Sequence, residues 1–154
     1  MLAILPFMTD TGHVIRLSLR SGYELLDLIE VVSDRLSAMA GLDEDASHWV
    51  SGAVRESVSN AIKHGNREDP SKQVTIEFAF APKAQPTEFS IEVLDEGEGF
   101  EPQEIADPLA PENILKSSGR GIFLIRNFMD ETVLKKVPGG MEIRMVKKLT
   151  KADA

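Results

Sequence analysis

The chain has 154 residues and a formal net charge of −8 at neutral pH, with 42% hydrophobic and 27% charged residues. This length and composition predict one globular domain with an ordinary core. The acidic balance argues against direct binding of nucleic acid, which requires clustered lysine and arginine. The sequence contains no cysteine, which excludes disulfides and thiolate metal sites and is compatible with a reducing cytoplasm.

The opening stretch MLAILPFMTD is apolar, but it is shorter than the roughly 20 residues that a membrane span needs. It also lacks the basic region that begins a signal peptide. We therefore expect no membrane partner and a cytoplasmic location.

Hydrophobic periodicity predicts a strand and two helices in the first part of the chain. Apolar residues alternate over 13–19, as in a half-buried strand, and recur every three or four positions over 23–39, as in an amphipathic helix. A second helix is expected to be capped by Ser47 and to run to about His64. Gly65 then occupies the place where a helix often ends in the left-handed conformation.

The second part of the chain predicts four strands and one helix, in the order of strands 73–80 and 89–94, helix 121–129 and strands 132–137 and 142–148. Residues 101–119 contain three prolines and no sustained periodicity, and a loop of that length is usually functional or disordered. The order β-α-α-β-β-loop-α-β-β predicts a two-layer α+β sandwich.

The stretch ESVSNAIKHGN carries three polar residues at intervals of four. On a helix that advances 100° per residue, Glu56, Asn60 and His64 lie within an arc of about 80°. Taken alone, such a row is most simply a solvated helix face. Asparagine is a poor helix former, which argues slightly against that interpretation.

The stretch LDEGEGF follows a predicted strand. Asp95 at the strand end can accept a hydrogen bond from a ligand amine, while Gly97 and Gly99 permit close approach of the backbone. An ordinary acidic turn would have the same composition.

The stretch SSGRGIFLI places glycines at the start of an apolar helix. Gly119 and Gly121 would leave free N–H groups at the positive end of the helix dipole, where a phosphate can bind, and Lys116 and Arg120 would add donors. A flexible hinge before a core helix is the alternative. The stretch is neither a dinucleotide-binding fingerprint nor a P-loop.

The order of these three stretches resembles the GHKL ATPase superfamily. Residues 56–65 match its N box, 95–99 its first glycine box and 119–121 its second, with the intervening segment as the ATP lid. The wording NAIKHG and the run GIFLIRNFMDE are most similar to the anti-sigma-factor serine kinases of the RsbW and SpoIIAB type. The resemblance covers about residues 10–149. It implies a single domain over 1–154 with the Bergerat fold, a two-layer α/β sandwich with a mixed sheet and helices on one face.

The resemblance also implies roles for individual residues around bound ATP and Mg²⁺. Asn60 would coordinate the metal, and Glu56 would be the catalytic base toward a serine hydroxyl of a protein substrate. Asp95 would accept from the adenine amine. The remaining ATP-binding residues would be His64, Gly65, Gly97, Gly99, Lys116, Ser117, Ser118, Gly119, Arg120 and Gly121.

The function implied is that of an anti-sigma factor with ATP-dependent serine/threonine-protein kinase activity. It would bind a sigma factor, phosphorylate a STAS-domain antagonist and form a homodimer through its first strand and helix. The alternative is a non-catalytic, ATP-gated binding module, although the presence of Glu56 favours the kinase. Two positions depart from the family pattern: Met141 replaces the usual threonine, and Arg120 stands where relatives often carry an apolar residue. No histidine lies in a phospho-acceptor motif, so self-phosphorylation on histidine is not expected.

Overall fold

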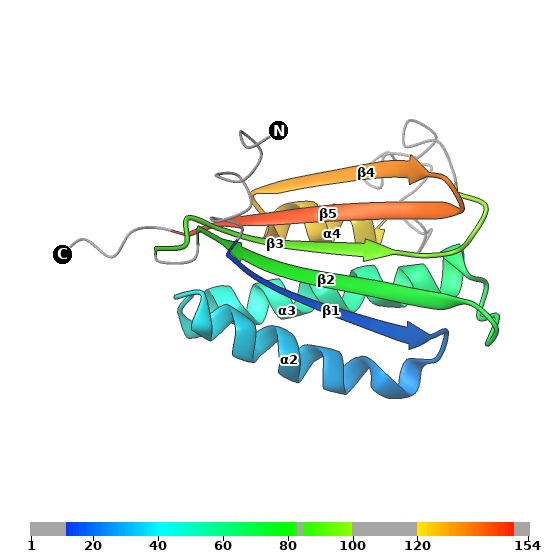
Figure 1. The fold of residues 1–154 in the computed structure, drawn as a ribbon, viewed down its shortest axis with the longest axis horizontal. Coiled ribbons are helices and arrows are strands. Elements are labelled where there is room, and N and C mark those ends of the chain that lie inside the picture. The colour runs from blue at the N-terminus through cyan, green and yellow to red at the C-terminus, as the bar shows by residue number, and fades with distance from the viewer. Residues whose placement is uncertain (1–11, 83–84, 100–119, 150–154) are drawn as a thin grey trace, which may run out of the picture.

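The computed structural model describes residues 12–82, 85–99 and 120–149. Its centre is a five-stranded sheet with the strand order β1-β2-β3-β5-β4 (Figure 1). The strands are β1 (His13–Arg20), β2 (Gln73–Ala81), β3 (Glu88–Leu94), β4 (Glu131–Val137) and β5 (Gly140–Lys148). Each predicted strand is therefore confirmed, to within one or two residues at its ends.

The pairings between the described strands are all antiparallel, so the expectation of a mixed sheet is wrong. The reason lies in the connection between β1 and β2. Two helices lie between these strands, one returning along the sheet and the next running forward again, so β2 enters the sheet opposite to β1.

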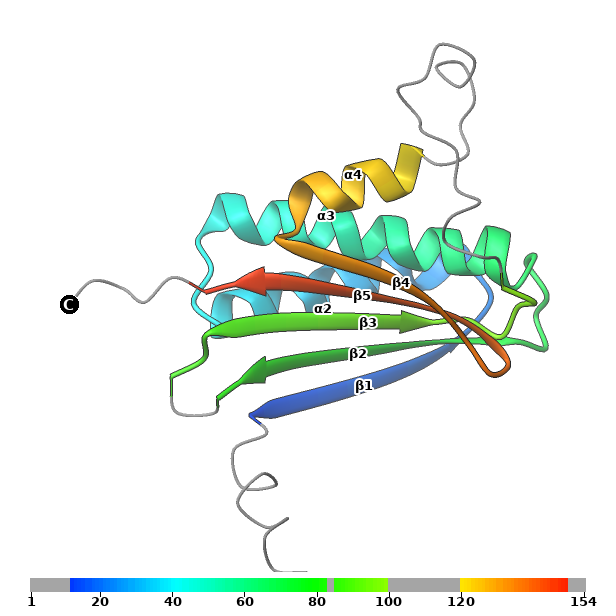
Figure 2. The ribbon, with the colours of Figure 1, turned by 90° about the horizontal axis from the view of Figure 1, so that it is seen from above.

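The helices form a second layer on one face of the sheet, as Figure 2 shows. They are α2 (Leu26–Met39), which follows a short 3-10 turn at Tyr23–Leu25, α3 (Glu44–Asn60) and α4 (Arg120–Phe128). Helix α3 packs between α2 and α4. The predicted two-layer α+β sandwich with helices on one face is confirmed. Within the described residues, no helix is long and apolar enough to cross a membrane.

Helix α3 begins earlier than the sequence pattern indicated. Asp43 is the N-cap, and its side chain accepts a hydrogen bond from the Ala46 amide at 2.8 Å. Carboxylates in the first turn also stabilise the positive end of the helix dipole. Ser47, the expected cap, instead lies buried within the helix.

The end of α3 also differs from the expectation. After Asn60 the chain continues as one π turn, Ala61–Gly65 (η3), in which the Asn66 amide donates to the Ala61 carbonyl at 2.7 Å. Gly65 does not adopt a left-handed conformation. The positive φ angles fall on two residues just beyond it, Arg67 at 52° and Glu68 at 58°.

The core lies between the sheet and the helix layer. Alternate side chains of β2 and β3 point into it and are almost fully buried, namely Val74, Ile76, Phe78, Phe80, Phe89, Ile91 and Val93. Residues of α3 meet them from the other side, among them Val50, Val54 and Val58. The period of two that predicted these strands therefore reflects one buried face.

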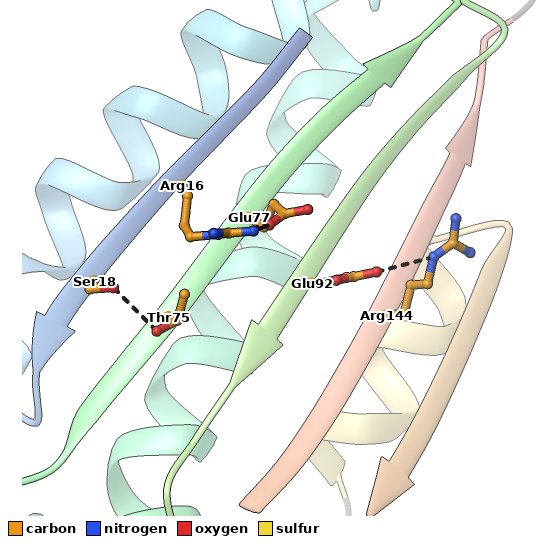
Figure 3. A network of polar contacts seen from close by, with 6 residues as sticks. All are labelled: Arg16, Ser18, Thr75, Glu77, Glu92 and Arg144. Carbon is orange, nitrogen blue, oxygen red and sulfur yellow. Dashed lines mark hydrogen bonds and ion pairs between the residues drawn. The ribbon is translucent and has the colours of Figure 1, made fainter. Parts of the chain in front are cut away.

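The other face of the sheet points away from the helices and carries polar pairs (Figure 3). Cross-strand pairs join Arg16 to Glu77, Ser18 to Thr75 at 3.2 Å, and Glu92 to Arg144 at 3.6 Å. Such pairs contribute to strand pairing on an open face.

Candidate functional site

Glu56 and Asn60 lie together on the face of α3 that meets the first turn of α4. A Cβ atom added to Gly121 would overlap the Glu56 Oε1 atom and would lie 2.8 Å from Asn60 Nδ2. Glycine at this position therefore lets the start of α4 approach the two polar side chains directly. The structure brings together two residues of the predicted N box and one of the second glycine box.

His64 lies on the π turn that follows Asn60. The predicted 80° arc assumed a regular α-helix, and this turn departs from that geometry. The His64 side chain is exposed, and no described contact joins it to Glu56 or Asn60. Its place beside a nucleotide stays a prediction.

Asp95 follows β3 directly, and its two carboxylate oxygens have different surroundings. Oδ1 accepts hydrogen bonds from the Gly97 amide at 2.9 Å and the Met141 amide at 3.0 Å. Oδ2 faces Gly65, where an added Cβ atom would overlap it. Glycine at position 65 is therefore required for the close approach to Asp95. This contact explains the glycine, whereas the expected left-handed helix end does not.

Burial raises the pKa of Asp95, while the amides of Gly97 and Met141 and the charge of Lys72 oppose that shift. Among the described residues, none donates a hydrogen bond to Oδ2. A partly buried carboxylate with one oxygen held by the backbone and the other unoccupied is suited to accept from an amine of a ligand.

Three backbone segments meet closely around Asp95. A Cβ atom on Gly97 would overlap the Gly65 carbonyl oxygen, and one on Gly140 would overlap the Asp95 carbonyl oxygen. Gly99 has a φ of 78°, which favours glycine. Sequence reasoning placed Gly97 and Gly99 here but missed Gly140, which lies between the predicted strands 132–137 and 142–148.

Sequence reasoning also missed Asn66. Its side chain is completely buried, and it makes hydrogen bonds to Ser21, Gln73 and the Glu96 amide. The available signal was only its polar side chain directly after the N box. A turn at this place would normally be exposed, so the pattern did not reveal the burial of Asn66.

A scan against models of protein families matches the histidine kinase-like ATPase domain over residues 23–147. The match includes Glu56, Asn60, Asp95 and Gly121. The chain belongs to this family.

Curated relatives of this histidine kinase-like ATPase domain carry two related names. The chain is 31% identical over 150 residues to serine-protein kinase RsbW of Staphylococcus epidermidis, covering 94% of this chain and 92% of the relative. It is 37% identical over 106 residues to the anti-sigma F factor of Anoxybacillus flavithermus, covering 66% of this chain and 68% of the relative. The resemblance to the RsbW type is thus confirmed.

The fold has a counterpart among solved structures. The chain matches a crystal structure of the RsbU and RsbW domains of a Mycobacterium tuberculosis protein with a TM-score of 0.65 and 16% identity, covering 91% of this chain and 33% of that one. At this identity the match supports the fold alone.

Several predicted residues of the histidine kinase-like domain cannot be placed. Lys116, Ser117, Ser118 and Gly119 lie outside the described residues, as does the whole segment 101–119. Arg120 begins α4, but its side chain is not among those described. The contribution of this part of the second glycine box stays a prediction.

The described residues contain no group of three or more histidine and acidic side chains that could hold a metal ion by themselves. Mg²⁺, however, usually takes one or two protein oxygens together with waters and substrate phosphates. The side-chain amide of Asn60 carries such an oxygen and lies beside the start of α4. The residues present therefore fit a magnesium ion that is held jointly with a nucleotide.

Proposed function

We propose that the chain is an anti-sigma factor with ATP-dependent serine/threonine-protein kinase activity, which binds a sigma factor and phosphorylates a STAS-domain antagonist. The observation that carries the proposal is the placement of Glu56 and Asn60 against Gly121 of α4, with Asp95 at the other end of the same N-box segment. The names of the relatives support the activity and the sigma-factor partner.

Each end of this segment has a separate task. At one end, Asp95 Oδ2 accepts from the exocyclic amine of adenine, and the glycines at 65, 97 and 140 leave room for the base. At the other end, the free N–H groups at the start of α4 face the phosphates. Asn60 helps to hold Mg²⁺, which neutralises charge on the phosphate oxygens when bound.

Glu56 is the base for the transfer. A serine hydroxyl of the protein substrate attacks the γ-phosphorus of ATP, the bond from that phosphorus to the leaving ADP oxygen breaks, and the hydroxyl proton passes to the Glu56 carboxylate. The products are phosphoserine, ADP and a protonated Glu56, which then returns its proton to water. A module that only binds ATP has no use for a carboxylate at this place, and this argues against the non-catalytic alternative.

A homodimer and a cytoplasmic location belong to the same proposal. Strand β1 lies at an edge of the sheet, and apolar side chains on β1 and α2 are exposed, including Val14, Leu28 and Val31. An edge strand beside an exposed apolar helix face suits association with a second copy. A sigma-factor partner places the complex in the cytoplasm.

Capture of partners from the native cytoplasm in ATP or ADP, followed by labelled ATP, tests the kinase. We expect the parent protein to label a captured protein on serine or threonine. The Glu56→Gln variant should bind ATP within about threefold of the parent and lose transfer by about 100-fold or more, because the base is absent.

The matched control is Glu44→Gln, which removes an exposed carboxylate from the first turn of the same helix and should leave transfer unchanged. Transfer by Glu56→Gln at the parental rate would remove Glu56 from the role of base. ATP binding without labelling of any captured partner would favour the non-catalytic module.

A further inference from the structure

Asn66 makes hydrogen bonds to several segments that are distant in sequence. Its side chain has 0% exposure. Its Nδ2 group donates to Ser21 Oγ at 2.9 Å, beyond the end of β1, and to the Gln73 carbonyl at 2.9 Å, at the start of β2. Its Oδ1 atom accepts from the Glu96 amide at 2.7 Å, just beyond β3. All the hydrogen-bonding atoms of this buried amide thus have partners.

The backbone around Asn66 is unusual, and hydrogen bonds hold it in place. The Asn66 amide closes the π turn by donating to Ala61, and the Glu68 amide donates to the Ile62 carbonyl at 2.8 Å. Arg67 and Glu68, the two residues that follow Asn66, both have positive φ. Strained residues of this kind persist where the surrounding structure determines them, and they are concentrated at functional sites.

The bond from Asn66 Oδ1 holds the loop that carries Asp95. Glu96 is the next residue after Asp95, so the 2.7 Å bond fixes this loop to the end of the π turn η3. On its other side the loop is held to β5, since Asp95 exchanges backbone and side-chain hydrogen bonds with Met141. Both attachments help to fix the position of Asp95, whose Oδ2 atom faces Gly65.

We propose that Asn66 is a positioning residue for nucleotide recognition: through its bond to the Glu96 amide it sets the place of Asp95 relative to the N box, and so controls affinity for the adenine base. This inference rests on the proposed function, because it assigns adenine recognition to Asp95. Asn66 does not touch Glu56 or Asn60 in the described contacts, so it acts on the base end of the nucleotide and leaves the transfer step alone.

The test measures ATP and ADP affinity by calorimetry for Asn66→Ala, with exchange of the Glu96 amide hydrogen followed by NMR in the nucleotide-free protein. We expect the affinities for ATP and ADP to fall equally, by about tenfold, since one buried hydrogen bond and its geometry are lost. Glu96 should lose protection while the amides of β2 and β3 keep theirs. With a phosphorylatable partner, KM for ATP should rise about tenfold at an unchanged kcat, whereas a general loss of structure would lower kcat as well.

A further variant separates the acceptor bond from a donor bond. Ser21→Ala removes the acceptor of one Nδ2 bond, together with the bond of the Ser21 hydroxyl to the Lys72 carbonyl, and leaves the bond to the Glu96 amide in place. It should bind ATP within about threefold of the parent, even if Asn66→Ala does not fold.

A tenfold loss of affinity in Ser21→Ala would overturn the proposal, as would parental affinity in a folded Asn66→Ala. If the parent itself bound no adenine nucleotide, the proposed function would fail instead. Exchange at Glu96 would then still show whether Asn66 holds the loop.

Discussion

Burial makes the ionised carboxylate of Asp95 costly for folding, but the same position leaves one of its oxygens available to a ligand. Burial raises its pKa, and the two backbone amides that bind Oδ1 offset only part of that cost. The second oxygen faces Gly65 without a donor among the described residues. A group held in this way gains a full partner when an amine of a ligand arrives.

Asp95→Asn should therefore weaken ATP binding by about 100-fold, because an amide group replaces the anionic acceptor. Calorimetry with Mg²⁺ and ATP measures the change. Glu98→Gln is the matched control, since Glu98 lies in the same loop and makes only an exposed ion pair with Arg67 at 3.8 Å. Equal affinities of Asp95→Asn and the parent would remove Asp95 from the site.

The raised pKa of Asp95 also predicts a dependence of stability on pH. A carboxyl whose pKa is higher in the folded state favours folding at pH values below its ordinary pKa, and this contribution is lost as pH rises through the folded value. Asparagine does not ionise, so the Asp95→Asn variant has no such loss of stability as pH rises. The free energy of unfolding of the variant, relative to the parent, should therefore increase from acid toward neutral pH in urea titrations. A difference that stays constant with pH would contradict the raised pKa.

At the scale of elements, the packing of α4 on α3 brings the two helices together at both ends of their contact. Gly121 at the start of α4 lies against Glu56 and Asn60, and Phe128 at its end lies near Gly52 of α3. The helices therefore run in opposite directions, and the start of α4 is held over the polar pair.

Two helical glycines with different surroundings give a matched comparison. A Cβ atom on Gly52 would lie 3.6 Å from the Phe128 ring, an ordinary contact, whereas one on Gly121 would overlap Glu56. Gly52→Ala should thus raise the free energy of unfolding by about 0.5–1 kcal/mol and leave ATP binding unchanged. Gly121→Ala should fold, because flexible side-chain ends can move, but should lower phosphoryl transfer about tenfold or more by displacing Glu56. Parental transfer by Gly121→Ala would contradict the described packing.

The elements could be predicted because their signals are local. Strands β2 and β3 bury one face, so alternation along the sequence revealed them, and α2 and α3 bury a stripe with the helical period. The π turn that follows Asn60 has no periodic signature, so the sequence predicted a regular helix up to His64. The antiparallel direction of every described pairing and the role of Asn66 depend on contacts between distant segments, which periodicity does not report.

The candidate site residues also divide into those that the sequence indicates and those that only the packing reveals. Glu56, Asn60, Asp95 and Gly121 were found because their order along the chain resembles a known family, although each alone fitted an ordinary surface or turn. Gly140 and Asn66 were missed because what distinguishes them is close packing against Asp95 and Glu96. The contacts that require glycine at position 140 and asparagine at position 66 form only in the folded chain.

At the scale of the whole molecule, the site lies at the junction of the two layers. The sheet supplies the loop after β3 and the start of β5, which hold Asp95, while the helix layer supplies Glu56, Asn60 and Gly121. The segment from Glu56 to Gly65 contacts both groups. The two-layer fold thus places the proposed base-recognition end and the proposed phosphate end on one continuous piece of chain.

The central claim is that this chain binds a magnesium–adenine nucleotide at that junction, and calorimetric titration with ATP in the presence of Mg²⁺ tests it most directly. We predict a dissociation constant in the micromolar range, about −8 kcal/mol of binding free energy. The absence of binding by both ATP and ADP at concentrations up to about 1 mM, which corresponds to about −4 kcal/mol, would contradict the account.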